Sequence, residues 1–395
     1  MAHLNRALDQ APEELALRLI GIEVLLRAGL WWEAQAALKP LRSRYPDDAR
    51  LRWLEWQALV LHPQPDRATV EAALDDLADV VLDDDQAVRG LSLKARLLAR
   101  VGRLEEAQAS HAGAIAAAGT APAWIQAESH YCHGLTCLAA GDQLVACQAF
   151  WAATEVRPAS YITQQAKQRL QAVLAELDDH SVMQPFATLH ERIRALKKLH
   201  KDSVTLAGFD LYRQGLAAAW VPGSRPTETR LATYRLDEIL PENARALDVS
   251  AEQGFLLLGL AERLAHGEGL DPKPFNTELG MAAAETLGIE HIRLSNQSLE
   301  GFKSKKPFDL ILACGAHASS ELGAEALGRL LYALCAPGGV VLLESRGIRS
   351  TQEVEPEFAE NAAVIAGVGF HVERKDYLCD DGINKREFRV LRRQS

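Results

Sequence analysis

Residues 245–271 constrain the fold more than any other part of the chain. A short apolar run ends at Asp248, a turn of small and polar residues continues to Gly254, and leucines at helical spacing follow. Asp271 then closes the next apolar stretch. This order of strand, turn, helix, strand and acid is how a doubly wound α/β domain holds an adenosine-type cofactor. We therefore expect such a domain to begin shortly before residue 245.

Beyond this segment, apolar runs alternate with helical patterns, which predicts a parallel, doubly wound sheet. We expect strands near residues 245–249, 267–271, 291–295, 308–313, 339–344, 370–377 and 385–392. Helices are expected near residues 254–265, 275–287, 320–335 and 355–367. No helical pattern separates the last two strands, and the turn 380–382 joins them. They should form a hairpin, so that one strand runs antiparallel to the rest.

The N-terminal half, up to residue 178, is rich in Ala, Leu, Arg and Glu and predicts helices. Similar phrases begin at Gly29, Gly102 and Gly141, each with an alanine five residues later. This order of helix, glycine turn and helix resembles the tetratricopeptide repeat, whose period is about 34 residues. The resemblance implies an α-solenoid over residues 1–178 with a groove for a protein or peptide partner. Five of its tryptophans either fill the helix pairs or line that groove: Trp31, Trp32, Trp53, Trp56 and Trp124.

Residues 179–228 are expected to form a helical linker between the halves. Residues 186–200 have helical spacing and one basic face, which is either solvated or in contact with phosphate or an acidic substrate. Proline and glycine in residues 220–226 predict a loop. Residues 227–240 read as a helix that leads into the first strand.

The C-terminal part, residues 229–395, resembles the class I S-adenosylmethionine-dependent methyltransferases. Residues 308–317 are similar to that family's fourth-strand motif, and residues 330–344 to its helix, Pro-Gly-Gly turn and fifth strand. The closing hairpin agrees with the family's sheet. The resemblance implies a Rossmann-like, seven-stranded, doubly wound sheet and S-adenosylmethionine as cofactor. The methyl acceptor cannot be named from the sequence.

The resemblance also implies which residues bind the cofactor. The family's turn is Asp-x-Gly-x-Gly-x-Gly or a looser form, and the matching residues here are Asp248, Ser250, Ala251 and Gly254. Ser250 replaces the first glycine, and its side chain would crowd the cofactor unless the backbone shifts. Glu252 adds negative charge to the turn.

Later strand ends supply the other candidate positions. Asp271 matches the acid that accepts hydrogen bonds from the two ribose hydroxyls. Gln297 and Ser298 follow the third strand, where the family contacts adenine, and Ala313 ends the fourth. His317 is the candidate general base, because histidine titrates near neutrality. Its alternatives are a loop histidine or a substrate hydrogen-bond donor. Methyl transfer needs little acid–base help, since positioning can suffice.

Composition limits the remaining alternatives. The chain has 395 residues, a formal net charge of −10 and six cysteines without a CxxC pair. We expect reduced cytoplasmic thiols, no metal site, no signal peptide and no membrane span. A first alternative to a methyltransferase is a catalytically silent binding scaffold, suggested by Ser250. A second is an RNA-modifying enzyme, suggested by the basic stretches 192–201 and 386–393, although the acidic balance makes nucleic acid a less expected partner.

Overall fold

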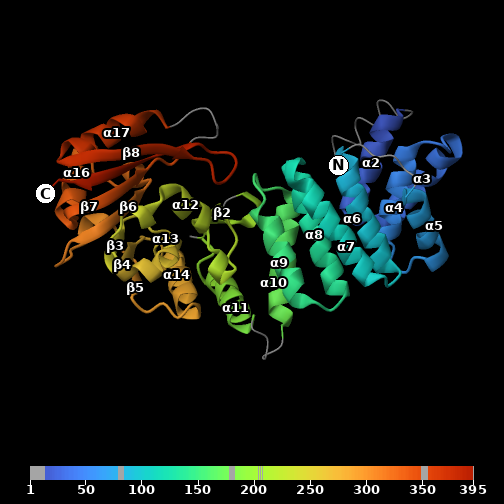
Figure 1. Ribbon diagram of the computed structural model, residues 1–395, viewed down its shortest axis with the longest axis horizontal. Coiled ribbons are helices and arrows are strands. Elements are labelled where there is room, and N and C mark those ends of the chain that lie inside the picture. Colours follow the sequence, from blue (N-terminus) through green and yellow to red (C-terminus); the bar gives the residue numbers. More distant parts are fainter. Residues whose placement is uncertain are drawn as a thin grey trace. The chain divides into compact units, whose positions relative to one another are not determined.

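The computed structural model describes residues 14–78, 84–177, 183–202, 204, 206, 208–347 and 355–394. The chain forms two compact units, Met1–Ala149 and Phe150–Ser395 (Figure 1). The division falls within helix α9 (Gln143–Glu155). The boundaries expected at residues 178 and 228 stay a prediction. None of the helices in the described ranges is long and apolar enough to cross a membrane.

The first unit is helical, as predicted. Its helices before α9 are α2 (Leu15–Arg27), α3 (Trp31–Arg44), α4 (Ala49–Leu61), α5 (Arg67–Ala78), α6 (Asp84–Arg100), α7 (Leu104–Ala117) and α8 (Ala123–Ala139). Gly29, Gly102 and Gly141 each lie between two helices with φ near +80°, a left-handed conformation that favours glycine. The alanines five residues after them are fully buried: Ala34, Ala107 and Ala146. The repeated phrase therefore builds the same glycine turn and close helix contact three times.

The tryptophans of the first unit divide between core and surface. Trp56 is buried, whereas Trp32 and Trp124 are 66% and 38% exposed. The guanidinium of Arg89 lies over the rings of Trp53 and Trp124, at 5.6 and 5.1 Å from their centroids. The core interpretation therefore holds for Trp56, and a partner groove lined by the exposed tryptophans stays a prediction.

The second unit contains the predicted seven-stranded sheet, in the order β5-β4-β3-β6-β7-β9-β8 (Figure 1). Its strands are β3 (Ala244–Asp248), β4 (Leu264–Leu270), β5 (Ile292–Ser295), β6 (Phe308–Cys314), β7 (Cys335–Glu344), β8 (Phe370–Leu378) and β9 (Arg386–Arg393). The strands from β3 to β7 pair in parallel, and β9 is antiparallel to both β7 and β8. Strand order and the reversed hairpin strand confirm the expected fold class.

Both faces of the sheet are buried, as a parallel sheet requires. One core combines Leu310 and Leu312 with helices α11 (Gln184–Leu199), α12 (Thr227–Tyr234), α13 (Phe255–Gly259) and α14 (Pro274–Thr286). The other combines Ile311 and Ala313 with α16 (Ala324–Leu334) and α17 (Pro356–Gly367). Helices α10 (Tyr161–Glu176) and α15 (Ala316–Ser319) complete the unit's α-helices in the described residues beyond α9.

The loop expected at 220–226 is wrong for residues 223–226, which form a strand, and the linker is not purely helical. Strand β1 (Tyr212–Gly215) pairs in parallel with β2 (Gly223–Pro226). The backbones approach so closely that a Cβ on Gly223 would lie 2.2 Å from the Gly215 nitrogen. A strand of four residues is too short to show a clear alternation of apolar and polar side chains. Proline and glycine therefore dominated the sequence pattern and predicted a loop. The expected helices 254–265 and 320–335 are also shorter, as α13 and α16 show.

Candidate functional site

A pocket opens at the carboxyl ends of β3, β4, β5 and β6, where the strand order reverses between β3 and β6. Ligands of doubly wound sheets bind at this switch point. The cavity volume is about 280 Å³, near the lower end of small-molecule sites, roughly 300–1,000 Å³. Four of the predicted residues lie on its wall: Ser250, Asp271, Gln297 and Ser298.

Three predicted residues of the turn after β3 lie behind the wall. Asp248 is buried, and one carboxylate oxygen accepts a hydrogen bond from the Ser250 amide at 3.2 Å. Burial raises the pKa of Asp248 to about 7. Ala251 is buried, and its amide donates to the Leu270 carbonyl at 2.9 Å. Gly254 has φ +69°, and a Cβ there would meet the Leu294 side chain at 2.6 Å. These residues shape the turn without lining the pocket.

The two residues that stand where the family's turn has glycine, Ser250 and Glu252, both bind other residues of this chain. The Ser250 hydroxyl donates to the Cys314 carbonyl at 2.9 Å and so ties the turn to the end of β6. Glu252 has φ +50°, the left-handed conformation that glycine adopts most easily. Its carboxylate forms an ion pair with Arg213 of β1 at 2.9 Å. Both Glu252 and Arg213 line the pocket.

Asp271 is held at the end of β4 with its side chain on the pocket wall. Its Oδ1 accepts hydrogen bonds from the Lys273 amide at 2.8 Å and from the Asn276 amide group at 3.0 Å. Burial raises its pKa, and these two hydrogen bonds act in the opposite direction. Among the described residues Oδ2 accepts no hydrogen bond, which leaves it available to a ligand.

The remaining predicted site residues differ in whether they line the pocket. The Gln297 side chain donates to the Ser295 hydroxyl at 2.8 Å, and Gln297 and Ser298 border the pocket beyond β5. Ala313 is fully buried, and the wall residue is instead the next one, Cys314. Burial raises the pKa of the Cys314 thiol to about 11, so it is neutral at physiological pH.

His317 does not line the pocket. Its Nε2 lies 3.1 Å from a Glu355 carboxylate oxygen, its side chain is 1% exposed, and its ring packs against Phe358. Burial lowers its pKa, and Glu355 acts in the opposite direction. The geometry holds the ring in place beneath the surface and gives no support to its role as a base.

The sequence did not predict the side of the pocket that carries Arg213, Arg225 and Arg346, which we call the arginine side. Arg213 and Arg225 come from β1 and β2, and Ser345 and Arg346 follow β7. The Arg346 side chain donates to Glu355 at 3.0 and 3.2 Å. The Arg225 guanidinium donates a hydrogen bond of 3.1 Å to the Arg346 carbonyl. Arg213 and Arg225 reach the pocket on the paired strands β1 and β2, and no local sequence pattern predicts that pairing.

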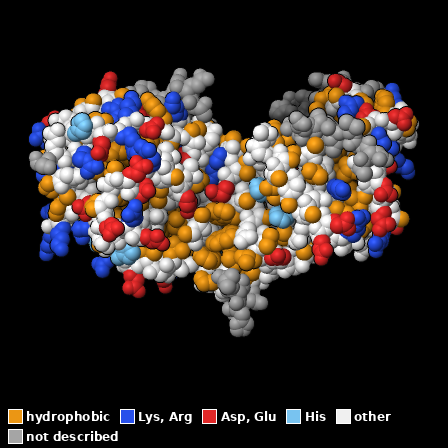
Figure 2. Space-filling view, in the orientation of Figure 1, with side chains coloured by type: hydrophobic (Ala, Val, Ile, Leu, Met, Phe, Trp, Pro, Cys, Tyr) orange, Lys and Arg blue, Asp and Glu red, His pale blue; other side chains and the backbone are white. Residues whose placement is uncertain are grey.

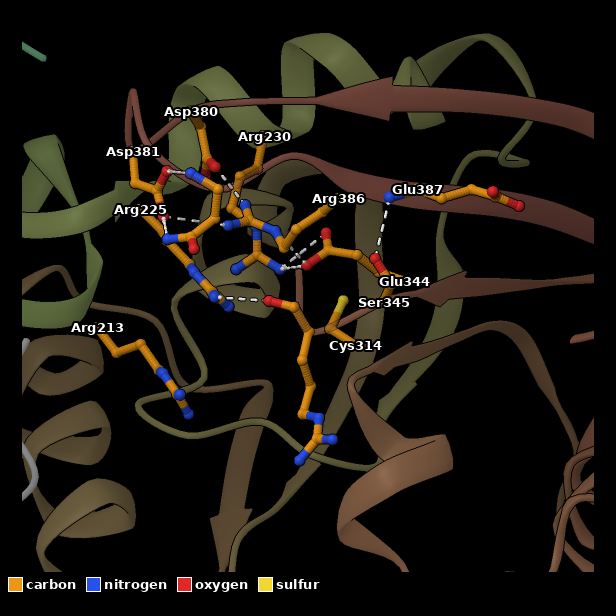
Figure 3. A network of polar contacts seen from close by, with 12 residues as sticks. Arg213, Arg225, Arg230, Cys314, Glu344, Ser345, Asp380, Asp381, Arg386 and Glu387 are labelled. Atoms are coloured by element: carbon orange, nitrogen blue, oxygen red, sulfur yellow. Dashed lines mark hydrogen bonds and ion pairs between the residues drawn. The ribbon is translucent and has the colours of Figure 1, made fainter. Parts of the chain in front are cut away.

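A buried charge network lies beside this arginine side (Figure 3). Glu344, at the end of β7, forms ion pairs with Arg230 at 3.3 Å and Arg386 at 2.9 Å, and all three side chains are at most 2% exposed. The Tyr234 hydroxyl also donates to Glu344. Arg386 further pairs with Asp380 and, at 3.7 Å, with Asp381 of the hairpin. The network joins α12, β7 and β9.

The basic stretch 386–393 is therefore not a free basic surface. It forms β9, where Arg386 is buried, Arg389 pairs with Glu387 at 2.7 Å and Arg392 pairs with Glu373 at 2.9 Å. On the face shown in Figure 2, acidic and basic side chains are mixed over the unit that contains the sheet. These paired arginines give no support to RNA binding by residues 386–393.

Comparisons with known proteins give matches among solved structures alone. No family model and no curated protein matches the chain. The N-methyltransferase NodS from Bradyrhizobium japonicum is 16% identical over 43% of this chain and 97% of its own, with a TM-score of 0.36. The YcgJ protein from Bacillus subtilis is 14% identical over 42% of this chain and 99% of its own, with a TM-score of 0.36. An rRNA methylase from Streptococcus thermophilus is 13% identical over 42% and 97%, with a TM-score of 0.35.

Proposed function

We propose that this chain is an S-adenosylmethionine-dependent methyltransferase whose site is the pocket at the ends of β3, β4 and β6. The observation that carries the proposal is the Asp271 carboxylate. It lines the pocket at the end of the second strand of a doubly wound sheet, where Oδ1 accepts two hydrogen bonds and Oδ2 accepts none from the described residues. A fixed carboxylate at this position suits the two hydroxyls of a ribose.

The other wall residues fit the same cofactor. Gln297 and Ser298 lie beyond β5, next to Asp271 in the strand order, where a base attached to that ribose would reach. The turn after β3 brings Ser250 and Glu252 to the middle of the pocket. When bound, the cofactor's sulfonium supplies an already activated methyl group. The described wall contains no histidine, so the protein's contribution is to orient the acceptor and exclude water.

Calorimetric titration with S-adenosylmethionine tests the proposal. Asp271→Ala removes a charge-assisted acceptor, so we expect affinity to fall about tenfold or more. Asp237→Ala is the matched control, because Asp237 is exposed and away from the pocket wall. A folded Asp271→Ala variant with wild-type affinity would contradict the assignment.

A second candidate is a binding scaffold that has the fold without catalysis. Glu252 favours it, because its side chain and Arg213 occupy the wall beside the turn where the family has a bare glycine. The same titration separates the candidates. Absence of binding by the wild type would favour the scaffold, and binding would favour the enzyme.

We also propose that the helical unit recognises a protein or peptide partner. Trp124 is partly exposed and contacts Arg89, which lies 3.6 Å from Glu128 and 3.7 Å from Glu23. Aromatic and arginine side chains in one cluster are typical of interaction hot spots. The identity of such a partner is a separate question from the chemistry of the pocket.

A further inference from the structure

The charges on the pocket wall are unevenly distributed. The side formed by β4, β5 and the segments after them carries Asp271 and Glu300 together with one cation, Lys273. The other side of the switch point carries Arg213, Arg225 and Arg346, from β1, β2 and the segment after β7, and the turn after β3 adds one carboxylate, Glu252. The two sides of the pocket thus suit ligand groups of different charge.

Of these three arginines, Arg225 differs in its partners. Arg213 forms an ion pair with Glu252 at 2.9 Å, and Arg346 forms one with Glu355 at 3.0 Å. Arg225 has no ion pair among the described residues, and its polar contact there is the Arg346 carbonyl at 3.1 Å. It is half-buried, and burial lowers the pKa of its guanidinium to about 10, with Arg386 acting in the same direction.

The carboxylates that act on the charge of Arg225 have ion-pair partners of their own. Glu344 pairs with Arg230 and Arg386 (Figure 3), and Glu252 pairs with Arg213. A half-buried guanidinium without a counter-charge is unfavourable, and an anion in the pocket would offset that cost. Its planar fork of donors suits a carboxylate or a phosphate bound through two oxygens.

We propose that the methyl acceptor carries an anionic group, a carboxylate or a phosphate, that binds Arg225 on the β6–β7 side of the pocket. This inference rests on the proposed function, because it assigns the other side of the pocket to the cofactor. Arg225 reaches the wall next to Ser345 and Arg346, at the end of β7 and two strands beyond β3. The anionic group is therefore placed beyond the turn that follows β3, away from Asp271.

The experiment is a calorimetric titration of inorganic phosphate, and separately of acetate, into the full-length protein saturated with S-adenosylhomocysteine. Ionic strength is held constant with chloride. We expect an anion to bind the wild type while the cofactor product stays bound, and Arg225→Met to weaken that binding about tenfold or more. Arg225→Lys keeps the charge but loses the fork, so an intermediate affinity is expected. Whichever of phosphate and acetate binds more tightly identifies the acceptor's anionic group.

Two controls make the outcomes distinct. Arg293→Met removes an exposed arginine of β5 outside the pocket and should bind the anion like the wild type. The affinity of each variant for S-adenosylhomocysteine reports that its pocket is folded. If the wild type binds no S-adenosylhomocysteine, the proposed function fails and the acceptor assignment fails with it.

If S-adenosylhomocysteine binds, the anion titration decides the inference alone. Equal anion affinity in the wild type and both Arg225 variants overturns it. Competition between the anion and S-adenosylhomocysteine also overturns it, because Arg225 would then hold part of the cofactor. Simultaneous binding that depends on Arg225 supports it.

Discussion

Ser250 shows how one hydroxyl can replace a glycine in the turn after β3. The expectation was that its side chain crowds the pocket, yet the hydroxyl is engaged with the Cys314 carbonyl at 2.9 Å. The side chain still borders the cavity. It therefore has two separable effects: it stabilises the contact between β3 and β6, and it takes up space beside the ligand.

Ser250→Gly is predicted to separate these effects. Loss of the hydrogen bond and the added chain entropy should lower the free energy of unfolding by about 1–2 kcal/mol. Removing the side chain should strengthen binding of S-adenosylmethionine. Urea unfolding and calorimetry measure the two quantities, and Ser250→Ala isolates the hydrogen bond from the backbone effect. Unchanged affinity in Ser250→Gly would show that serine causes no crowding.

The sequence identified those wall residues whose place follows from a motif. Ser250 and Asp271 occupy fixed positions after apolar strands, and Gln297 and Ser298 follow the next strand. Ala313 and His317 were also predicted from their positions at and after a strand end. Whether such a residue reaches the pocket depends on how the chain turns after β6. There Cys314 faces the pocket, and His317 packs beneath with Glu355.

Strands β1 and β2 form an element that the sequence did not reveal. The long strands of the sheet read as apolar runs because both their faces are buried. The short pair has no such run, and it depends instead on the close approach of the backbones at Gly215 and Gly223. Arg213 and Arg225 lie on these two strands. The arginine side of the pocket therefore depends on the close approach of the β1 and β2 backbones.

Gly223→Ala is predicted to separate β1 from β2. Its Cβ would lie 2.2 Å from backbone atoms of Gln214 and Gly215, which cannot move aside as a flexible side chain would. We expect a loss of about 1–3 kcal/mol in the free energy of unfolding, typical of overpacking. Gly367→Ala is the control, since its Cβ meets nothing within 4 Å. Equal stability of the two variants in urea unfolding would contradict the prediction.

The unit that carries the sheet depends on a buried charge network as well as on its two apolar cores. Glu344 lies between Arg230 and Arg386 with 1% of its side chain exposed. Burial alone would raise its pKa, but the two arginines outweigh burial and hold the pKa below the ordinary value of 4.5. The carboxylate therefore stabilises the folded state while it is ionised.

Glu344→Gln is predicted to lower the free energy of unfolding by about 3–5 kcal/mol near neutral pH, because it removes the carboxylate partner of buried Arg230 and one of the carboxylate partners of buried Arg386. The depressed pKa of Glu344 means that its contribution is present above pH 4.5 and is lost as pH falls through the lower folded value. The difference between wild type and variant should thus shrink in acid. Glu325→Gln, in an exposed pair with Arg329, should cost less than about 1 kcal/mol. Urea unfolding at several pH values measures both, and a constant difference would contradict the assignment.

The position of Arg386 has a consequence for how the protein is made. Strand β9 comes after every other described strand in the chain, so Arg386 leaves the ribosome after β3, β4 and β7 have already emerged. Domains fold as units during synthesis, and the sheet cannot neutralise Glu344 fully before that arginine arrives. The turn after β3 is thus synthesised early, and the residues that support the arginine side of the pocket are synthesised late. A nascent chain acquires a finished pocket only when its hairpin has been synthesised.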